Sequence, residues 1–444
     1  MLNFNPHKFK VMRKILILLF CVPAFVMAQQ KTYMPDDAFE MHIETRDTTG
    51  GWCLLGSPAS IGDGIMNDSV YTDYLDLMGV VDISNMGVSD LRGIEDMDSL
   101  VYLYCDNNNL SEIPLSPYQR LNIQKVDCAY NKIDILDFSG NTKLWELICN
   151  DNDLVYLNLD SCDYLTTGLN CDNNELTYLD ISAVTQLWWF TCENNLLTDL
   201  IVAGAHIEEF HCSNNQLTTL DVTGVTYLYY LDCSYNNLTT LIKDQLIEEL
   251  FCNNNFLSGP IDFVGSGWLD ASYNQFTELD FSFPSPGAWN GYHYIDVRYN
   301  NLHTLSFSNI IDTMLANNFN IPGYYFSSVG NPDLHCITLD NPPYFDTVWT
   351  VANGSIDSCV SFSTACSMET EGCMDSTDTN YNPFATIEDC SCSNLVSNAE
   401  QIINSNRYLI SIVDILGRES KPTPNVPLFY RYDDGTVEKR IVIE

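Results

Sequence analysis

Apolar and polar positions follow one short pattern that returns about every 21 residues over most of the chain. The pattern is LxxLxCxxNxLxxL, and residues 230–241, YLDCSYNNLTTL, are one copy of it. The second leucine and the cysteine are two positions apart, so both point to the same face of a short strand. The asparagine ends that strand, and a second apolar set such as Leu238 and Leu241 follows. A period of this length, repeated many times, predicts a solenoid in which each copy is one coil.

Two columns of side chains are expected to run through the coils. Stacked parallel strands place successive cysteines about 4.8 Å apart, where the thiol acts as a small hydrophobe. The asparagine amide can hydrogen-bond backbone groups of neighbouring turns. The predicted ladder comprises Cys105, Cys128, Cys149, Cys171, Cys192, Cys212, Cys233 and Cys252, with Asn108, Asn131, Asn152, Asn174, Asn195, Asn215, Asn236 and Asn255. Ile83 precedes the cysteine column, which Ala271, Val297 and Leu315 continue, while Asn274, Asn300 and Asn318 continue the asparagine column.

The pattern resembles the leucine-rich repeat family, with LxxLxCxxNxLxxLDxS in place of the commoner all-leucine version, over residues 80–340. The resemblance implies a solenoid with a parallel β-sheet on its concave face and a mostly irregular convex side. Residues 29–79 resemble the N-terminal cap of such arrays in exported bacterial proteins, with a short amphipathic helix expected within residues 32–44. Residues 331–340 are expected to close the array with Cys336 on the cysteine column, before a C-terminal cap and linker at 341–371.

The outward positions of the predicted strands are rich in aromatic and acidic side chains. These positions are the two residues before the second leucine and the one before the cysteine. Aromatic residues favour strands for packing reasons alone, but pairs such as Trp188 and Trp189 cannot both point inward. Exposed aromatic clusters are typical of binding hot spots and of stacking on sugars or peptides. The predicted binding residues are Tyr102, Tyr104, Trp145, Trp188, Trp189, Glu209, His211, Tyr229, Tyr230, Asp232, Phe251, Trp268 and Tyr294.

The sequence contains no recognised catalytic motif. It has no HExxH, no GxSxG and no phosphate-binding glycine loop, and its seven histidines are scattered. A general-base role for His211 is conceivable, but a surface histidine with acidic neighbours is far commoner. We therefore expect a binding protein for an extracellular protein or glycan, and not an enzyme. The alternative is a structural spacer or matrix component of the cell surface without a specific ligand.

Charge and the N-terminus limit the partners and the location. The chain has 19 Lys and Arg against 59 Asp and Glu, a net charge of −40, which argues against nucleic acid and anionic membranes as partners. Residues 1–28 read as a signal peptide with basic residues at 13–14, an apolar run at 15–26 and a small-residue cleavage site ending at Ala28. That run is too short to cross a bilayer, and no later segment comes closer, so no transmembrane segment is expected.

Six cysteines follow the repeats in polar, turn-rich sequence: Cys336, Cys359, Cys366, Cys373, Cys390 and Cys392. In an exported chain they are expected to form disulfides, with Cys373–Cys392 preferred and Cys336 paired with Cys359 or Cys366 next. The ladder cysteines are expected to be buried free thiols, because single cysteines one coil apart lack the tetrahedral convergence of a metal site. Disulfides between adjacent coils are the geometrically awkward alternative.

Residues 372–392 form a cysteine-bracketed module similar to a GCTDPxAxNYNPxAxxDDGSC-type element of large exported proteins of the Bacteroidota, with Cys390 replacing the usual glycine. A disulfide-stapled spacer without metal is favoured, and no cofactor is expected. The alternative is calcium, since hard oxygen ligands are available and the EF-hand pattern is absent. The candidate ligands are Asp375, Asp378, Asn380, Asn382 and Asp389.

The last segment, residues 397–444, reads as three strands of a small β-sandwich-like domain at 409–419, 428–435 and 436–444. It resembles the C-terminal sorting domain of type IX secretion cargo, with a D-x-LGR strand, an FY-x-Y-DDG hairpin and a K-x-I-x-I end. The resemblance implies recognition by the type IX secretion machinery, passage through the outer membrane, and removal of the domain or attachment at the cell surface. The matching residues include Asp414, Gly417, Arg418, Asp433, Asp434, Gly435 and Lys439.

Overall fold

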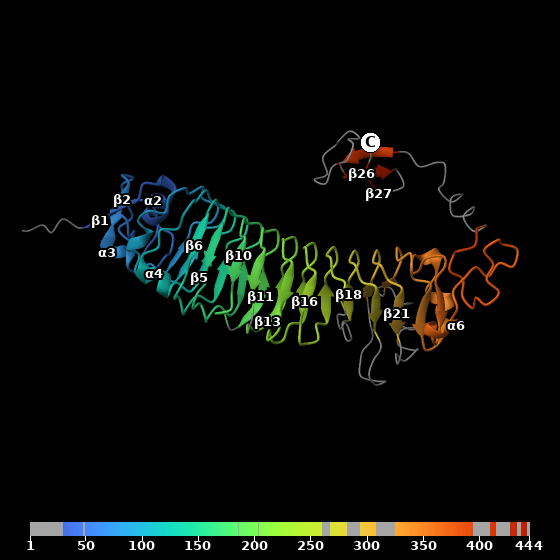
Figure 1. Cartoon of the computed structure of the whole chain (residues 1–444). Helices are drawn as coiled ribbons and strands as arrows, with labels where there is room; N and C mark the ends of the chain where they lie inside the picture. The colour runs from blue at the N-terminus through green and yellow to red at the C-terminus, as the bar shows by residue number, and fades with distance from the viewer. Residues whose placement is uncertain are drawn as a thin grey trace, which may run out of the picture.

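The computed structural model places most of the chain in one long array of coils (Figure 1). The structure describes residues 30–47, 49–184, 186–202, 204–259, 267–281, 294–307, 325–393, 409–413, 427–432 and 437–441. The predicted signal peptide therefore lies outside the described residues.

One parallel sheet of twelve strands runs along the array, and we call its solvent face the long-sheet face. Neighbouring strands pair in register, so Phe210 lies opposite Leu231 and the inward leucines form one row. This sheet is the predicted stack of coils. Its strands are β3 (Val80–Asp82), β4 (Tyr102–Tyr104), β5 (Lys125–Asp127), β7 (Glu146–Ile148), β9 (Gly168–Asn170), β11 (Leu187–Thr191), β13 (Ile207–His211), β15 (Tyr230–Asp232), β17 (Glu249–Phe251), β18 (Trp268–Asp270), β20 (Tyr294–Asp296) and β22 (Tyr325–Ser327).

The opposite wall, expected to be mostly irregular, also carries short parallel strands. Alternate residues such as Leu220 and Val222 are both buried, which is the period-2 pattern of a strand. The pairs are β6 (Ile135–Asp137) with β8 (Tyr156–Asn158), β10 (Tyr178–Asp180) with β12 (Asp199–Ile201), and β14 (Thr219–Asp221) with β16 (Thr240–Ile242). A four-stranded sheet follows, with β19 (Glu278–Asp280), β21 (Thr304–Phe307), β23 (Cys336–Leu339) and β24 (Ser361–Ser363).

Both predicted ladders are present inside the coils. All eight ladder cysteines are fully buried free thiols. Each ladder asparagine bridges two coils: the Asn236 amide donates to the carbonyl oxygens of Cys212 and Cys233 at 3.0 and 3.2 Å, and its side-chain oxygen accepts the Leu217 N–H at 3.0 Å. The residue before it, Tyr235, has the left-handed φ of 53°, as its counterparts have in the other coils. The asparagine therefore ties this strained turn to the backbone of the preceding coil.

The last coil of the array is formed by other residues than predicted. β20 pairs directly with β22, so Ser328 follows Val297 in the cysteine column and Asn331 follows Asn300 in the asparagine column. The predicted coil at Leu315 and Asn318 lies outside the described residues. The placement of Cys336 on the cysteine column is wrong, because Cys336 begins β23 of the opposite wall and forms a disulfide.

Compact caps cover both ends of the array. At the N-terminus, β1 (Lys31–Tyr33) pairs antiparallel with β2 (Ser69–Tyr71), followed by α3 (Thr72–Leu75). The predicted helix is confirmed as α2 (Asp37–Glu44), which Asp36 caps by accepting the N–H groups of Ala38 and Phe39. Between β3 and β5 the chain also forms η1 (Ile94–Asp96) and α4 (Pro117–Asn122).

The C-terminal cap contains α6 (Pro342–Val348), η2 (Val351–Asn353) and η3 (Cys366–Met368) around the buried Trp349, which stacks on Phe326 at 3.9 Å. The preferred disulfide Cys373–Cys392 is confirmed, and Cys336 pairs with Cys366, one of the two partners considered. The third disulfide joins Cys359 to Cys390.

The C-terminal segment forms one antiparallel sheet of β25 (Leu409–Val413), β26 (Pro427–Tyr432) and β27 (Val437–Ile441). The three predicted strands are confirmed. A second sheet, which a sandwich requires, is absent from the described residues.

Candidate binding face

The register of the long sheet sorts its outward side chains into two columns. One column contains Tyr102, Lys125, Glu146, Gly168, Trp189, Glu209, Tyr230, Glu249, Trp268, Tyr294 and Tyr325. The other contains Tyr104, Asp127, Ile148, Asn170, Thr191, His211, Asp232, Phe251, Asp270, Asp296 and Ser327. Trp145, Trp188 and Tyr229 lie one position before the first column. All of the predicted binding residues are exposed or half-buried, so none of them belongs to the buried core.

The first part of the face is organised around Lys125. Its ammonium nitrogen lies 5.5 Å from the ring centre of Tyr104 and 5.4 Å from that of Trp145, and it forms an ion pair with Glu146. Burial, the largest single effect, disfavours the charged lysine, but the hydrogen bond to Glu146 and the charge of that carboxylate, with smaller contributions from Tyr104 and Asp127, together raise the pKa of Lys125. The cation therefore holds two predicted binding aromatics in place. Lys125 was not among the predicted residues, because only the register of the strands places it near both rings.

The middle of the face presents Trp188, the most exposed of the predicted binding aromatics. Trp188 is 62% exposed, while the neighbouring Trp189 lies across Gly168 of the adjacent strand. A Cβ atom at position 168 would overlap the Trp189 indole. Glycine at this site therefore lets one tryptophan lie flat on the sheet while the other projects into solvent.

Next to this pair, rings form a short stack across three strands. Tyr230 lies between His211 and Phe251, with ring centres 4.6 and 5.4 Å apart, and its burial raises its pKa to about 12. Tyr229 is 46% exposed and donates a hydrogen bond from its hydroxyl to Glu249 at 3.1 Å. The stack therefore offers aromatic faces beside carboxylates.

A polar ridge runs beside this stack, formed by Asp172, Glu193, His211 and Asp232. Ser213 donates a hydrogen bond to Glu193 at 2.8 Å, and His211 Nδ1 lies 3.9 Å from the same carboxylate oxygen. Burial raises the pKa of Asp172. Ligand atoms of Glu193, His211 and Asp232 lie within 4.8 Å of one another, so this group could hold a cation.

The ridge lacks the arrangement needed for nucleophilic catalysis. Among the described residues, the His211 ring has no hydrogen bond to a serine, threonine or cysteine side chain. A general base must reach the proton it removes, directly or through water. The geometry therefore favours recognition of polar groups on a ligand.

The last part of the face is a second aromatic stack. Trp268 lies nearly parallel to Tyr294 at 5.7 Å, and Tyr294 stacks on Tyr325 at 4.9 Å. Arg298 lies 5.9 Å from the Tyr325 ring, and its guanidinium donates to the Asp296 carboxylate from Nε at 2.9 Å and from Nη2 at 2.6 Å. Tyr325 and Arg298 were missed, because the spacing of the pattern breaks down after residue 281.

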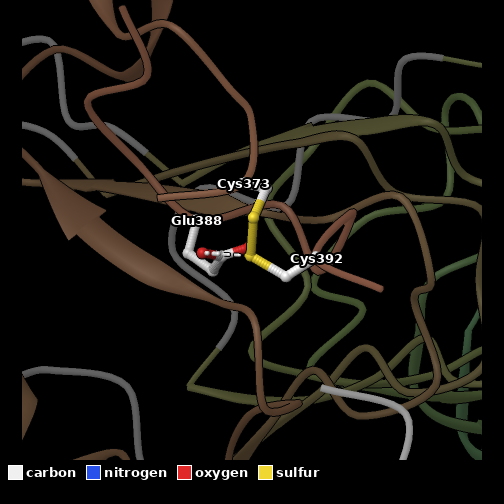
Figure 2. A group of neighbouring side chains, drawn as sticks. All are labelled: Cys373, Glu388 and Cys392. Atoms are coloured by element: carbon white, nitrogen blue, oxygen red, sulfur yellow. Dashed lines mark hydrogen bonds between the residues drawn. A yellow bond between two sulfur atoms is a disulfide. The ribbon is translucent and has the colours of Figure 1, made fainter. Parts of the chain in front are cut away.

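The cysteine-bracketed module has a carboxylate at its centre. Figure 2 shows Glu388 beside the Cys373–Cys392 disulfide, its oxygens 3.4 and 3.5 Å from Sγ of Cys392. These three residues group like metal ligands, but disulfide sulfurs are not thiolates and do not bind metal as a zinc site requires. Instead, Glu388 accepts the N–H groups of Met374 and Cys390 at 2.9 and 3.1 Å, which fastens the two ends of the module.

The calcium candidates of this module are engaged in local hydrogen bonds. Asp375 accepts from Thr377, Asp378 from Ser393, and Asp389 from Ser391, while Asn380 donates to the Ser391 carbonyl and Asn382 to that of Glu371. These contacts do not test the prediction of a metal-free spacer or its alternative, calcium binding. Of the predicted sorting residues, Lys439 lies on β27, and Asp414, Gly417, Arg418, Asp433, Asp434 and Gly435 lie outside the described residues.

Within the described residues, no helix is both long and apolar enough to cross a membrane. No family model matches the chain, and no curated protein matches it.

Solved structures similar to this chain are repeat proteins. An internalin (inlF) from Listeria monocytogenes is 16% identical, with 74% of this chain and 95% of that chain covered and a TM-score of 0.46. The functional domain of InlJ from Listeria monocytogenes, described as including a cysteine ladder, is 18% identical, with coverages of 94% and 99% and a TM-score of 0.38. YopM from Yersinia pestis, described as a leucine-rich effector protein, is 19% identical, with coverages of 60% and 78% and a TM-score of 0.38.

The geometry of the coils identifies the fold. Twelve strands pair in register, and their leucines and cysteines point inward. Asparagines join each coil to the one before it, as Asn236 and Asn215 do. The chain is folded as a leucine-rich repeat solenoid.

Proposed function

We propose that this protein is an exported recognition protein that binds an extracellular polypeptide or glycan across the middle of its long-sheet face. The observation that carries the proposal is the exposure of Trp188 and Tyr229, 62% and 46%, on a sheet whose other aromatics are packed against neighbours. Burying one such side chain contributes about 2–3 kcal/mol. A folded protein that leaves this apolar area in water has an unsatisfied surface on which a partner can dock.

The surrounding chemistry supports a ligand with flat apolar faces and hydrogen-bond donors. Tyr229 is paired with Glu249, and the polar ridge places Glu193 and Asp232 next to the aromatic stack. Sugars offer C–H faces for stacking and hydroxyl groups for carboxylates, and polypeptides offer N–H groups and cationic side chains. The net charge of −40 disfavours acidic ligands.

The test is a binding comparison between matched aromatic variants. We expect the variant Trp188→Ala, Trp189→Ala, Tyr229→Ala, Tyr230→Ala to lose at least tenfold in affinity for ligands found on glycan arrays and immobilised extracellular proteins. The control is Tyr156→Ala, Tyr178→Ala, which removes two rings, 50% and 52% exposed, from the opposite wall. Circular dichroism and thermal unfolding show whether both variants fold.

Unchanged binding by the first variant would remove the proposed site. If the parent protein captures no ligand, and both variants still assemble normally at the cell surface, the result would favour a structural spacer. We expect no turnover in a hydrolase screen, consistent with the absence of a histidine–nucleophile pair on the described face.

Export by the type IX secretion route is the second half of the proposal. Three disulfides support an oxidising, extracellular location, since such bonds persist outside the cytoplasm. The signal-peptide pattern at residues 1–28 and the sorting-domain pattern at residues 397–444 support entry into the periplasm and then passage through the outer membrane.

A further inference from the structure

We propose that the N-terminal cap binds a calcium ion between Asp37, Glu40 and Asp68. Ligand atoms of these three carboxylates lie within 4.8 Å of one another. Asp37 and Glu40 are three positions apart in the first turn of α2, so they share one face of the helix. Asp68 comes from the loop that leads into β2.

The buried carboxylate of Glu40 points to a ligand. Glu40 is fully buried, and its Oε1 accepts the N–H groups of Asn67 and Ser69, both at 2.9 Å. Its Oε2 is also buried and has no hydrogen-bond partner. A buried oxygen of a carboxylate is costly to leave unpaired, and an ion is one of the groups that can satisfy it.

The cluster lacks a positive partner of its own. Among the described residues, no ion pair involves Asp37, Glu40 or Asp68, whereas Asp63 in the same loop is paired with Lys31. Three neighbouring carboxylates without a cation repel one another. A bound divalent ion would remove both the repulsion and the unpaired oxygen.

The donor set selects a hard cation. Carboxylate oxygens alone suit calcium or magnesium, whereas zinc and copper prefer nitrogen or sulfur ligands. Magnesium usually keeps several water molecules and takes only one or two carboxylates, whereas calcium accepts several carboxylates in a flexible geometry. Three carboxylates within 4.8 Å of one another therefore favour calcium, and the exposure of Asp37 and Asp68 leaves room for the water molecules that complete its shell.

The site would join two parts of the cap that cover the first coil. Glu40 accepts hydrogen bonds from the N–H groups of Asn67 and Ser69 in the loop, and the Met34 N–H donates to the Asp68 carbonyl at 2.9 Å. A cation held by α2 and by this loop would fasten the helix to the β1–β2 sheet. Calcium is thus expected to stabilise the cap without touching the long-sheet face.

Calcium titration of the metal-stripped mature protein tests the site. With calcium chloride as the probe, we expect calorimetry to detect a site whose affinity falls at least tenfold in Asp37→Asn and in Asp68→Asn. Both side chains are exposed, and asparagine tolerates the left-handed φ of 59° at position 68, so these variants fold. Glu40→Gln should abolish binding, and magnesium chloride should bind more weakly.

Asp73→Asn is the matched control, because Asp73 is an exposed carboxylate of the same cap outside the cluster. Asp378→Asn is a second control, which distinguishes calcium bound by the cysteine-bracketed module from calcium bound by the cap. Calcium should also raise the unfolding temperature of the parent protein and of both controls, but not of Asp37→Asn. Absence of calcium binding by the parent protein, or equal binding by Asp37→Asn and Asp68→Asn, would overturn the proposal.

Discussion

The ladder asparagine is the residue that turns a repeated pattern into a continuous structure. Asn236 satisfies four backbone groups in two coils, the carbonyls of Cys212, Cys233 and Ser234 and the N–H of Leu217. A side chain needs both a donor and an acceptor, at the length of one amide, to make this set of bonds. Aspartate lacks the donor, and leucine lacks both.

We therefore expect Asn236→Ala to destabilise the solenoid by about 2–4 kcal/mol, because buried backbone groups lose their partners. The exposed neighbour Asn237 provides the matched control Asn237→Ala, which should change stability by less than about 0.5 kcal/mol. Urea unfolding of both variants measures the difference, and hydrogen exchange of the Leu217 amide reports on it locally. Equal midpoints for the two variants would contradict the ladder role of Asn236.

Single residues on the face show where sequence reasoning ends. The pattern predicts that Trp188 and Trp189 both lie outside the core, because they are the two residues before the inward position that Phe190 occupies in this coil. It does not show that Trp189 lies across Gly168 or that Lys125 joins Tyr104 to Trp145, because those neighbours are about a coil away in the chain. The calcium cluster was missed for the same reason: Asp68 is far from Glu40 in sequence.

At the scale of elements, the column of cysteines runs through the core as free thiols. Nine of the ten free cysteines among the described residues are buried, and only Cys53 is half-buried. Burial raises the pKa of the ladder thiols, and that of Cys162 to about 12. The reactive thiolate is therefore scarce at neutral pH, and the sulfurs are shielded from reagents.

We expect the native mature protein at pH 8 to react with about one equivalent of a thiol reagent, and the unfolded, unreduced protein with about ten. Absorbance of the released thiolate counts the reacting groups, and Cys53→Ser should remove the native equivalent. Fewer reactive thiols after unfolding would mean that adjacent coils are joined by disulfides, the alternative left open by the sequence. Native reactivity of many thiols would mean that the column is not buried.

Elements with a regular pattern were predictable, and those created by a break in the pattern were not. The strands of the long sheet and the capped helix α2 follow from leucine spacing and from the Asp36 cap. β22 was missed, because Ser328 replaces the cysteine that marked the earlier coils. The Cys359–Cys390 disulfide could not be assigned, since spacing alone does not determine connectivity.

At the scale of the whole molecule, a cap is fastened by hydrogen bonds to each end of the array. At the C-terminal edge, Ser328 donates its N–H to the Ser355 carbonyl and Ser327 its hydroxyl to the Gly354 carbonyl, at 2.8 and 2.7 Å. At the N-terminal end of the array, Asp36 of the cap accepts hydrogen bonds at 2.7 and 3.0 Å from the N–H and hydroxyl of Ser89, which follows β3 in the chain. An uncovered edge can pair with another chain, so the bonds at the C-terminal edge are expected to protect the array from edge-to-edge association.

The C-terminal sheet is not part of the solenoid or of its caps. Deleting this sheet therefore tests export without removing any part of the solenoid. The C-terminal cap ends the solenoid with its own disulfides before residue 393, and the sorting pattern begins only at residue 397. Deleting residues 409–444 should therefore leave a folded solenoid that stays in the periplasm of the native host. Immunoblots of periplasmic and culture fractions measure this, with the intact chain as reference.

Substitution within the same segment gives the sharper version of that experiment. Replacing Asp433, Asp434 and Gly435 with alanine keeps the chain length but removes the hairpin motif, so retention in the periplasm is again expected. Substituting three exposed residues of the opposite wall, Tyr156, Tyr178 and Ile242, should leave secretion unchanged. Normal release of the truncated chain would show that the export information lies elsewhere. If the truncated chain folds in vitro but is degraded in the periplasm, its loss is due to retention in that compartment and not to misfolding.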